Sequence, residues 1–155
     1  MGQCAGCLEQ NGDWMLKKKK KKGKTGMNSK AKKKQAVARA TIKKGSGKIK
    51  INKRALELQE PTYLKQFISE PLKIAGSLAK EVDIKVNVKG GGFMSQAAAA
   101  RSAIAKALLL YSKDNKLRTA FLAYDRMLLV DDVRRVESKK PLGTKARKKK
   151  QKSKR

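Results

Sequence analysis

Few residues in this chain could carry out catalysis, and their spacing does not favour it. Histidine is absent from the 155 residues, which removes Ser–His and Cys–His catalysis and the usual zinc ligand set. The two cysteines, Cys4 and Cys7, form a single C-x-x-C motif near the N-terminus. A metal site of this kind needs a second cysteine pair, and a redox motif needs a βαβ context. We therefore predict no enzymatic activity, metal or cofactor.

A glycine triplet, Gly90–Gly92, stands between a predicted strand and a predicted helix, an order that binds phosphates in many proteins. The G-x-x-x-x-G-K-[ST] motif is missing. A dinucleotide site would need a third glycine where Ser95 stands and a larger parallel sheet, although Asp114 lies at the distance of the ribose-binding acid. The adjacent Asp131 and Asp132 do not converge on one substrate. The triplet therefore indicates close backbone approach, or a helix N-terminus that holds an RNA phosphate without chemistry.

Charge is the strongest signal in the sequence. Lys and Arg number 41 against 12 Asp and Glu, which gives a net charge of +29 and a pI near 10.4. Such a charge indicates the kind of partner and not the fold. Nucleic acid is the first expectation, and an anionic membrane surface is the alternative. No apolar run predicts a transmembrane helix or a signal peptide.

The charge also divides the chain into a folded middle and two basic arms. Residues 1–35 carry a net charge of +9, residues 36–133 carry +9, and residues 134–155 carry +11. Because blocks of like charge repel one another, we expect the N-terminal extension and the C-terminal tail to be disordered until a partner neutralises them. A translation start at Met27, with residues 1–26 misassigned, is an open alternative.

The pattern of residues 36–133 predicts a fold of the α/β class. The expected arrangement is a two-layer α+β body, in which helices pack on a small sheet. Residues 36–43 and 48–52 alternate around a glycine-rich turn, which predicts a β-hairpin with a Lys- and Arg-lined face suited to RNA. Strict alternation over residues 82–89 predicts a further strand. Proline starts, apolar spacing and alanine content predict helices over residues 62–68, 71–80, 95–111 and 117–129. The aromatic residues expected in the core are Tyr63, Phe67, Tyr111 and Phe121.

Five ordered segments within residues 30–155 resemble a known family. They read AVARATIKKGSGKIKIN, EPLKIAG, VDIKVNVKGGGFMSQAAAARSAIAKAL, FLAYDRMLLVDDVRRVESKKPLG and KARKKKQKSKR. Together they look like the ninth protein of the small ribosomal subunit, and EPLKIAG and FLAYDR look like its archaeal form. The resemblance implies a body similar to the second domain of the fifth small-subunit protein. It also implies a place in the head of the subunit, against ribosomal RNA and other head proteins.

The resemblance further implies which residues contact RNA. In this family a C-terminal tail reaches transfer RNA in the peptidyl site, and residues 145–155 correspond to that tail. The resemblance therefore implies tRNA contacts from Ser153, Lys154 and Arg155. With Arg39 on the predicted strand face, the expected ribosomal RNA contacts are Lys32, Lys33, Lys34, Arg39, Gly90, Gly91, Gly92, Lys145, Arg147, Lys148, Lys149, Lys150 and Lys152. Three features depart from the family pattern. Ser95 replaces a glycine, the segment 30–34 keeps its charges but loses a glycine, and Lys150 replaces an aromatic residue.

The predicted function is that of a non-enzymatic ribosomal protein of the cytoplasm, bound to ribosomal RNA through phosphates. If about half of the tail cations contact phosphates, the slope of log affinity with log salt is roughly −3 to −4 from the tail alone. The alternatives are a polybasic peripheral membrane protein and a generic nucleic-acid-binding protein. Gly6 stands where myristoylation requires Ser or Thr, so no membrane partner is expected.

Overall fold

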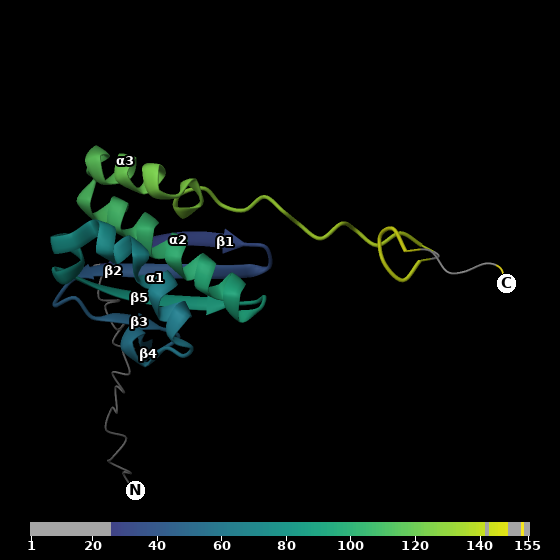
Figure 1. Ribbon diagram of the computed structural model, residues 1–155, viewed down its shortest axis with the longest axis horizontal. Coiled ribbons are helices and arrows are strands. Elements are labelled where there is room, and N and C mark those ends of the chain that lie inside the picture. The colour runs from purple at the N-terminus through teal and green to yellow at the C-terminus, as the bar shows by residue number, and fades with distance from the viewer. Residues whose placement is uncertain (1–25, 142, 149–152, 154–155) are drawn as a thin grey trace, which may run out of the picture.

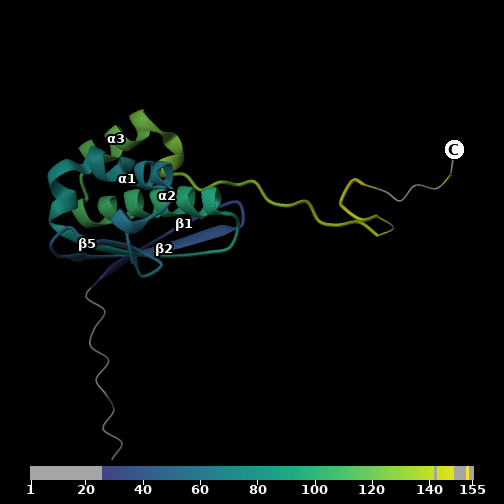
Figure 2. The same cartoon turned by 60° about the horizontal axis from the view of Figure 1, so that its bottom comes forward.

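A computed structural model describes residues 26–141, 143–148 and 153. In this part of the chain a five-stranded sheet forms one layer and three α-helices form the other (Figure 1). The helices lie together on one face of the sheet, and the opposite face carries no helix (Figure 2). The predicted two-layer α+β arrangement is confirmed.

The strands follow the spatial order β1-β2-β5-β3-β4, and β3 runs parallel to β5 while the other neighbours are antiparallel. Their bounds are β1 (Met27–Lys33), β2 (Ala36–Lys44), β3 (Ile49–Ile51), β4 (Arg54–Ala55) and β5 (Val82–Lys89). The helices are α1 (Thr62–Ala75), α2 (Phe93–Ser112) and α3 (Asn115–Tyr124). Short 3₁₀ segments cover Leu56–Leu58, Gly76–Lys80 and Arg126–Leu128.

The core forms where the central strands meet the alanine-rich helix α2. In β2 the buried residues alternate, and Ala38 and Ala40 lie opposite Val88 and Val86 of β5. Small side chains on both the strand and the helix allow α2 to approach the sheet closely. The strand predicted over residues 82–89 and the helix predicted over residues 95–111 are confirmed.

The predicted hairpin between residues 36–43 and 48–52 is wrong, although both segments are strands. β2 pairs with β1 and β5, whereas β3 pairs with β4 and lies parallel to β5 on its other side. The glycine-rich segment therefore carries the chain across β5 and does not form a tight turn. Alternation shows that a segment is a strand but does not identify its neighbour, and this ambiguity is the source of the error.

The predicted boundary of the N-terminal extension is also wrong for residues 27–33, which form edge strand β1. Ser29 and Ala31 point toward the helices and are buried, while Asn28 and Lys30 are exposed. The high lysine content conceals this alternation, because the buried side chains are small. Residues 1–25, including Cys4 and Cys7, lie outside the described residues, and the predictions about them stay predictions.

Two helical predictions and one core prediction also need correction. One helix, α1, continues through the buried Pro71, where two helices were expected, because packing of the proline ring against the core offsets the hydrogen bond that its missing N–H cannot make. Helix α3 ends at Tyr124, and Asp125 then accepts a hydrogen bond from the N–H of Met127 at the start of a 3₁₀ turn. Phe121 is fully buried as predicted, but Tyr63 is half exposed.

After Asp132, which is buried against the body, the chain leaves the body as a tail (Figure 1). It departs at the end where the turn between β1 and β2 lies, and Figure 2 shows the same direction of departure. None of the helices within the described ranges is both long and apolar enough to cross a membrane.

Candidate nucleic-acid interface

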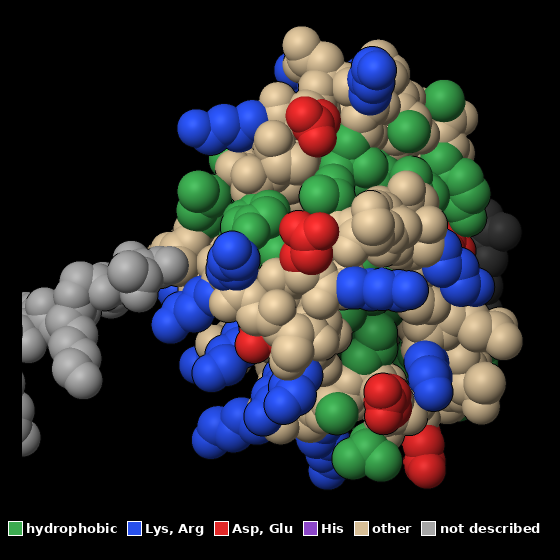
Figure 3. All heavy atoms as spheres, turned by 90° about the vertical axis from the view of Figure 1, so that its left-hand side faces the viewer, with side chains coloured by type: hydrophobic (Ala, Val, Ile, Leu, Met, Phe, Trp, Pro, Cys, Tyr) green, Lys and Arg blue, Asp and Glu red, His purple; other side chains and the backbone are tan. Residues whose placement is uncertain are grey.

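The helix-free side of the sheet, here called the open face, is strongly cationic. Strand register fixes its members, because residues paired across antiparallel strands point to the same side. Its one carboxylate in the described strands is Asp83. Its cations are Lys30, Lys32, Arg39, Lys43, Lys50, Lys85 and Lys89. In Figure 3, which views one end of the body, Lys and Arg side chains project along the left-hand side.

Several of these cations oppose one another directly. Lys30 pairs in register with Arg39, and Lys50 pairs with Lys85. Like charges opposite each other destabilise a sheet, so the arrangement works against the stability of the free protein. A polyanion laid across the open face would relieve this repulsion.

Asp83 places a single negative charge among the cations of the described strands on the open face, and its carboxylate also organises the loop before β3. Its Oδ1 accepts hydrogen bonds from the N–H groups of Ser46 at 3.0 Å and Lys48 at 2.9 Å. These backbone hydrogen bonds, with the nearby charges of Lys48 and Lys85, hold the pKa of Asp83 below its ordinary value. The carboxylate is therefore ionised and held by the loop.

A hollow of about 830 Å³ opens on this face between β2, β5 and the β3–β4 turn. The turn residues Asn52 and Lys53 both have positive φ, 45° and 73°. Oδ1 of Asn52 accepts a hydrogen bond of 2.8 Å from the N–H of Val88, which continues the pairing of β3 with β5 through a side chain. With Arg39 and Lys89 also in its lining, the hollow presents cations and amides to a phosphate backbone.

A second cationic surface lies at the end of the body from which the tail departs. A hollow of about 220 Å³ is lined by Lys34 and Gln35 of the β1–β2 turn and by Arg134, Arg135 and Val136 at the start of the tail. Lys34 has a φ of 52° and is exposed. The lining of this hollow contains no carboxylate.

The glycine triplet adjoins this end, and its three members do different things. Gly90 and Gly91 have φ values of 80° and 68°, and a Cβ on Gly90 would lie 2.7 Å from the carbonyl oxygen of Gln35. Gly92 has an ordinary extended φ and no atom within 4 Å of its would-be Cβ. The first two glycines are therefore required by close approach of the loop to the β1–β2 turn, and only Gly92 leaves room for a ligand.

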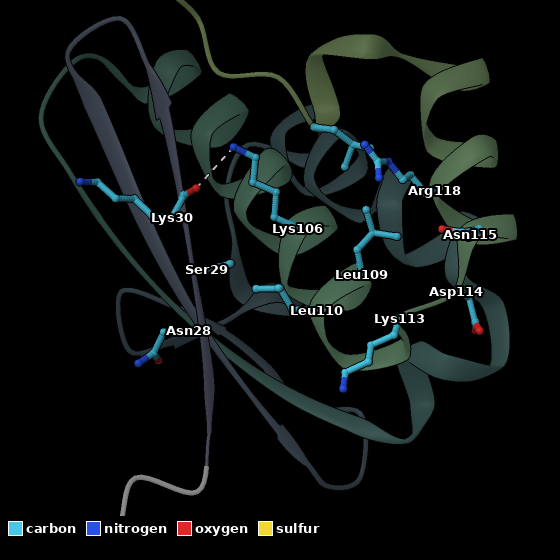
Figure 4. Close-up of a pocket in the computed structure, with 11 residues that line it drawn as sticks. Asn28, Ser29, Lys30, Lys106, Leu109, Leu110, Lys113, Asp114, Asn115 and Arg118 are labelled. Atoms are coloured by element: carbon cyan, nitrogen blue, oxygen red, sulfur yellow. Dashed lines mark hydrogen bonds between the residues drawn. The ribbon is translucent and has the colours of Figure 1, made fainter.

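The nucleotide-binding alternative fails on geometry. The triplet precedes α2, whereas Asp114 follows its C-terminal end, and a 20-residue helix is about 30 Å long. Asp114 instead lines a cavity of about 560 Å³ beside β1, with Lys30, Lys106, Lys113 and Arg118 (Figure 4). Its mixed charge and leucine lining distinguish this cavity from the open face.

Apart from the glycine triplet, the predicted contact residues fall into three groups. Lys32, Lys34 and Arg39 lie on the open face or at the turn beside it, while Lys33 points toward the helices and its Nζ lies 3.2 Å from a carboxylate oxygen of Asp132. Lys145, Arg147, Lys148 and Ser153 are exposed along the tail. Outside the described residues lie Lys149, Lys150, Lys152, Lys154 and Arg155.

Most cations of the open face were not among the residues predicted to contact RNA. Lys85 and Lys89 alternate with buried valines in the strand predicted over residues 82–89, and Lys50 alternates with buried or half-buried isoleucines. Their exposed positions were readable from that alternation. These lysines share one surface with Arg39 and Lys30 because of the strand order, and the strand order could not be predicted from the alternation.

A small α+β body with a cationic open sheet face and a basic tail defines the class of proteins built to bind a polyanionic backbone. Comparison with known proteins narrows this class. Residues 31–155 match the family model described as ribosomal protein S9/S16. The chain therefore belongs to the ribosomal protein S9/S16 family, whose members are part of the ribosome in the cytoplasm.

Archaeal relatives support the same assignment, and each is described as small ribosomal subunit protein uS9. The relative from Halobacterium salinarum is 50% identical over 127 residues, 81% of this chain and 96% of the relative. That from Picrophilus torridus is 52% identical over 122 residues, 79% of this chain and 92% of the relative. That from Methanococcus maripaludis strain C5 is 49% identical over 110 residues, with coverage of 71% and 82%. The resemblance to this family in its archaeal form is confirmed, and the likeness to the fifth small-subunit protein stays a prediction.

Proposed function

We propose that this chain is a structural, non-enzymatic constituent of the head of the small ribosomal subunit. In this proposal the body binds ribosomal RNA through its open face and the adjoining turn, and the tail reaches tRNA in the peptidyl site. Other head proteins are further partners. Family membership and the names of the relatives support the assembly, and the geometry supports the mode of binding.

The concentration of cations on the open face is the observation that carries the proposal for the body. Phosphate contacts supply most of the affinity of a basic protein for nucleic acid and fix its orientation. The exposed aromatic side chains Tyr63, Phe93 and Tyr124 lie on helices. The open face is thus suited to electrostatic recognition of structured RNA and not to base stacking.

Two doubly substituted proteins test the open face. Arg39→Ala with Lys85→Ala removes two cations from it. The matched control, Lys116→Ala with Arg118→Ala, removes the same charges from exposed positions on α3 in the helical layer. Binding of full-length protein to archaeal small-subunit ribosomal RNA is measured across a series of salt concentrations.

The open-face variant should bind more weakly than the control, and its slope of log affinity with log salt should be smaller by about 1.5, as expected for two lost phosphate contacts. Its melting temperature should be no lower than that of the intact chain, because the Lys30–Arg39 repulsion has gone. Equal affinity and slope for the two variants would show that RNA binds elsewhere on the body.

The proposal for the tail rests on its charge and on the exposure of most of its described residues. An extended basic segment enters RNA grooves that a folded body cannot. Deleting residues 153–155 removes two cations from the end and should leave subunit assembly intact while speeding dissociation of tRNA from the peptidyl site. Truncated subunits that retain this tRNA as long as intact ones would refute the role of the tail.

A polybasic peripheral membrane protein is the second candidate, motivated by the six consecutive lysines at residues 17–22. Co-sedimentation with small ribosomal subunits and with vesicles rich in anionic phospholipid separates the two functions. Recovery with vesicles and never with subunits would favour the membrane function.

A further inference from the structure

Two adjacent aspartates tie the root of the tail to edge strand β1. Oδ1 of Asp131 accepts a hydrogen bond from the N–H of Lys32 at 3.2 Å and lies 2.6 Å from Nζ of Lys106 on α2. The same Nζ donates to the carbonyl oxygen of Lys30 at 3.5 Å, the contact drawn in Figure 4. Asp131 thus joins the tail to both the sheet edge and α2.

Asp132 makes the second attachment, and its side chain is only 3% exposed. Its carboxylate accepts from the backbone N–H of Arg134 at 2.9 Å and from Nη2 of Arg134 at 2.8 Å, and lies 3.2 Å from Nζ of Lys33. Its own N–H donates to the carbonyl oxygen of Lys32 at 3.4 Å. The N–H and the carbonyl oxygen of Lys32 are therefore both hydrogen-bonded to the root of the tail, that is, to Asp131 and Asp132.

The chain leaves the body directly after this attachment. The guanidinium of Arg135 folds back, and its Nη1 donates at 2.8 Å to the carbonyl oxygens of Asp132 and Arg134. Val133 and Val136 are 85% and 77% exposed. Asp132 is thus the last residue before the extended tail whose side chain is buried against the body.

We propose that Asp131 and Asp132 are positioning residues, a carboxylate clamp that fixes where the tail starts and the direction in which it leaves the body. This inference rests on the proposed function of the tail. The position of a chain's root determines the volume that its far end samples, and hence the effective concentration of that end at its target. The clamp also selects the cations that are available to RNA, since its carboxylates pair with Lys33, Lys106 and the exposed Arg134. Lys34 and Arg135 are then the cations in the lining of the second cationic surface that pair with neither aspartate side chain.

The clamp itself is tested on the free, full-length protein. Asp132→Ala removes the buried acceptor, and Asp132→Asn, which keeps the size of the side chain, is used if the alanine variant does not fold. Glu137→Ala is the matched control, because it removes one carboxylate from the tail, where Glu137 pairs with Arg147 in an exposed position.

Backbone amide relaxation of residues 133–136 is the readout. In the Asp132 variant these amides should become as mobile as the residues beyond them, at a temperature at which the body of the variant is folded. In the Glu137 control they should match the intact chain. If the Asp132 variant leaves these amides as ordered as in the intact chain, the clamp does not exist and the inference is wrong.

The consequence for function is tested in assembled subunits that contain equal amounts of intact protein, Asp132→Ala, Glu137→Ala or the chain lacking residues 153–155. The Asp132 variant should release tRNA from the peptidyl site roughly three- to tenfold faster than the Glu137 control. Release at the control rate, alongside fast release by the truncated chain, would overturn the positioning role and leave the proposed function intact. Slow release by the truncated chain would refute the proposed function, and with it the tRNA-positioning role, whatever the relaxation data show.

Discussion

At the scale of single residues, Arg101 joins the three helices. Its Nε lies 2.8 Å from Oε2 of Glu70 on α1, and its Nη2 donates to Asp125 beyond α3 at 2.8 Å. The guanidinium carbon also lies 4.4 Å from the centre of the Phe67 ring, close enough for a cation–π interaction. The neighbouring Arg126 is exposed.

Removing Arg101 should therefore destabilise the body strongly. Arg101→Ala removes the ion pairs to Glu70 and Asp125, whose side chains are 25% and 31% exposed, and it leaves the buried Oε2 of Glu70 without its countercharge. Losing these partly buried ion pairs and the contact with Phe67 should cost about 2–3 kcal/mol. Urea unfolding of the free protein measures the loss. Arg126→Ala, an exposed substitution, should change the free energy of unfolding by less than about 0.5 kcal/mol. Similar losses for the two variants would contradict the role of Arg101.

Asp132 predicts a specific dependence of stability on pH. Hydrogen bonds from the side chain and backbone of Arg134, together with the charge of Lys33, hold the pKa of Asp132 far below its ordinary value of 3.8. Arg135 from the tail and Lys106 from α2, through Asp131, supply the other charged groups nearby. A lowered pKa in the folded state means that the carboxylate contributes stability fully above about pH 4, and that this contribution is lost as the pH falls further.

The urea midpoint of the intact chain should accordingly fall more steeply between pH 5 and pH 2.5 than that of the Asp132→Asn variant. Glu137→Gln, which removes a carboxylate from the tail, should follow the intact chain. Identical acid profiles for the intact chain and the Asp132 variant would show that the ion pairs at the tail root add no stability.

At the scale of elements, alternation and composition were enough to predict β5 and α2, because both are long and strongly patterned. They were not enough for β1, where the buried side chains are Ser29 and Ala31 and lysines fill the other positions. Pairing was beyond the sequence as well, since β3 could have formed a hairpin with β2 and lies parallel to β5 instead. The cationic open face depends on that pairing, so Arg39 was identified but its partners Lys30 and Lys85 were not.

The glycine loop gives a prediction at this scale. Gly90→Ala should lower the free energy of unfolding by about 1–3 kcal/mol, because its φ of 80° is strained for alanine and the new Cβ would meet the carbonyl oxygen of Gln35. Gly92→Ala should be nearly neutral, since its φ is ordinary and its surroundings are open. Chemical denaturation compares the two variants. Equal losses of stability for the two variants would contradict the claim that Gly90 is closely packed and Gly92 is not.

At the scale of the whole molecule, the charge is arranged by surface and not spread evenly. The helices carry the buried and partly paired charges around Arg101, whereas the open face, the β1–β2 turn and the tail carry cations with few acids nearby. The sequence predicted the basic tail and the family because they depend on composition and the order of motifs. It could not predict that Asp131 and Asp132 attach the tail to β1, since those contacts join residues about 100 positions apart.

The most direct test of the account is a structure of the small ribosomal subunit that contains this chain, with tRNA bound in the peptidyl site. We expect ribosomal RNA phosphates against Arg39 and Lys85 on the open face, Asp132 buried at the root of the tail, and Arg155 beside the tRNA backbone. An open face exposed to solvent or covered by another protein, with ribosomal RNA on the helical layer, would contradict the account.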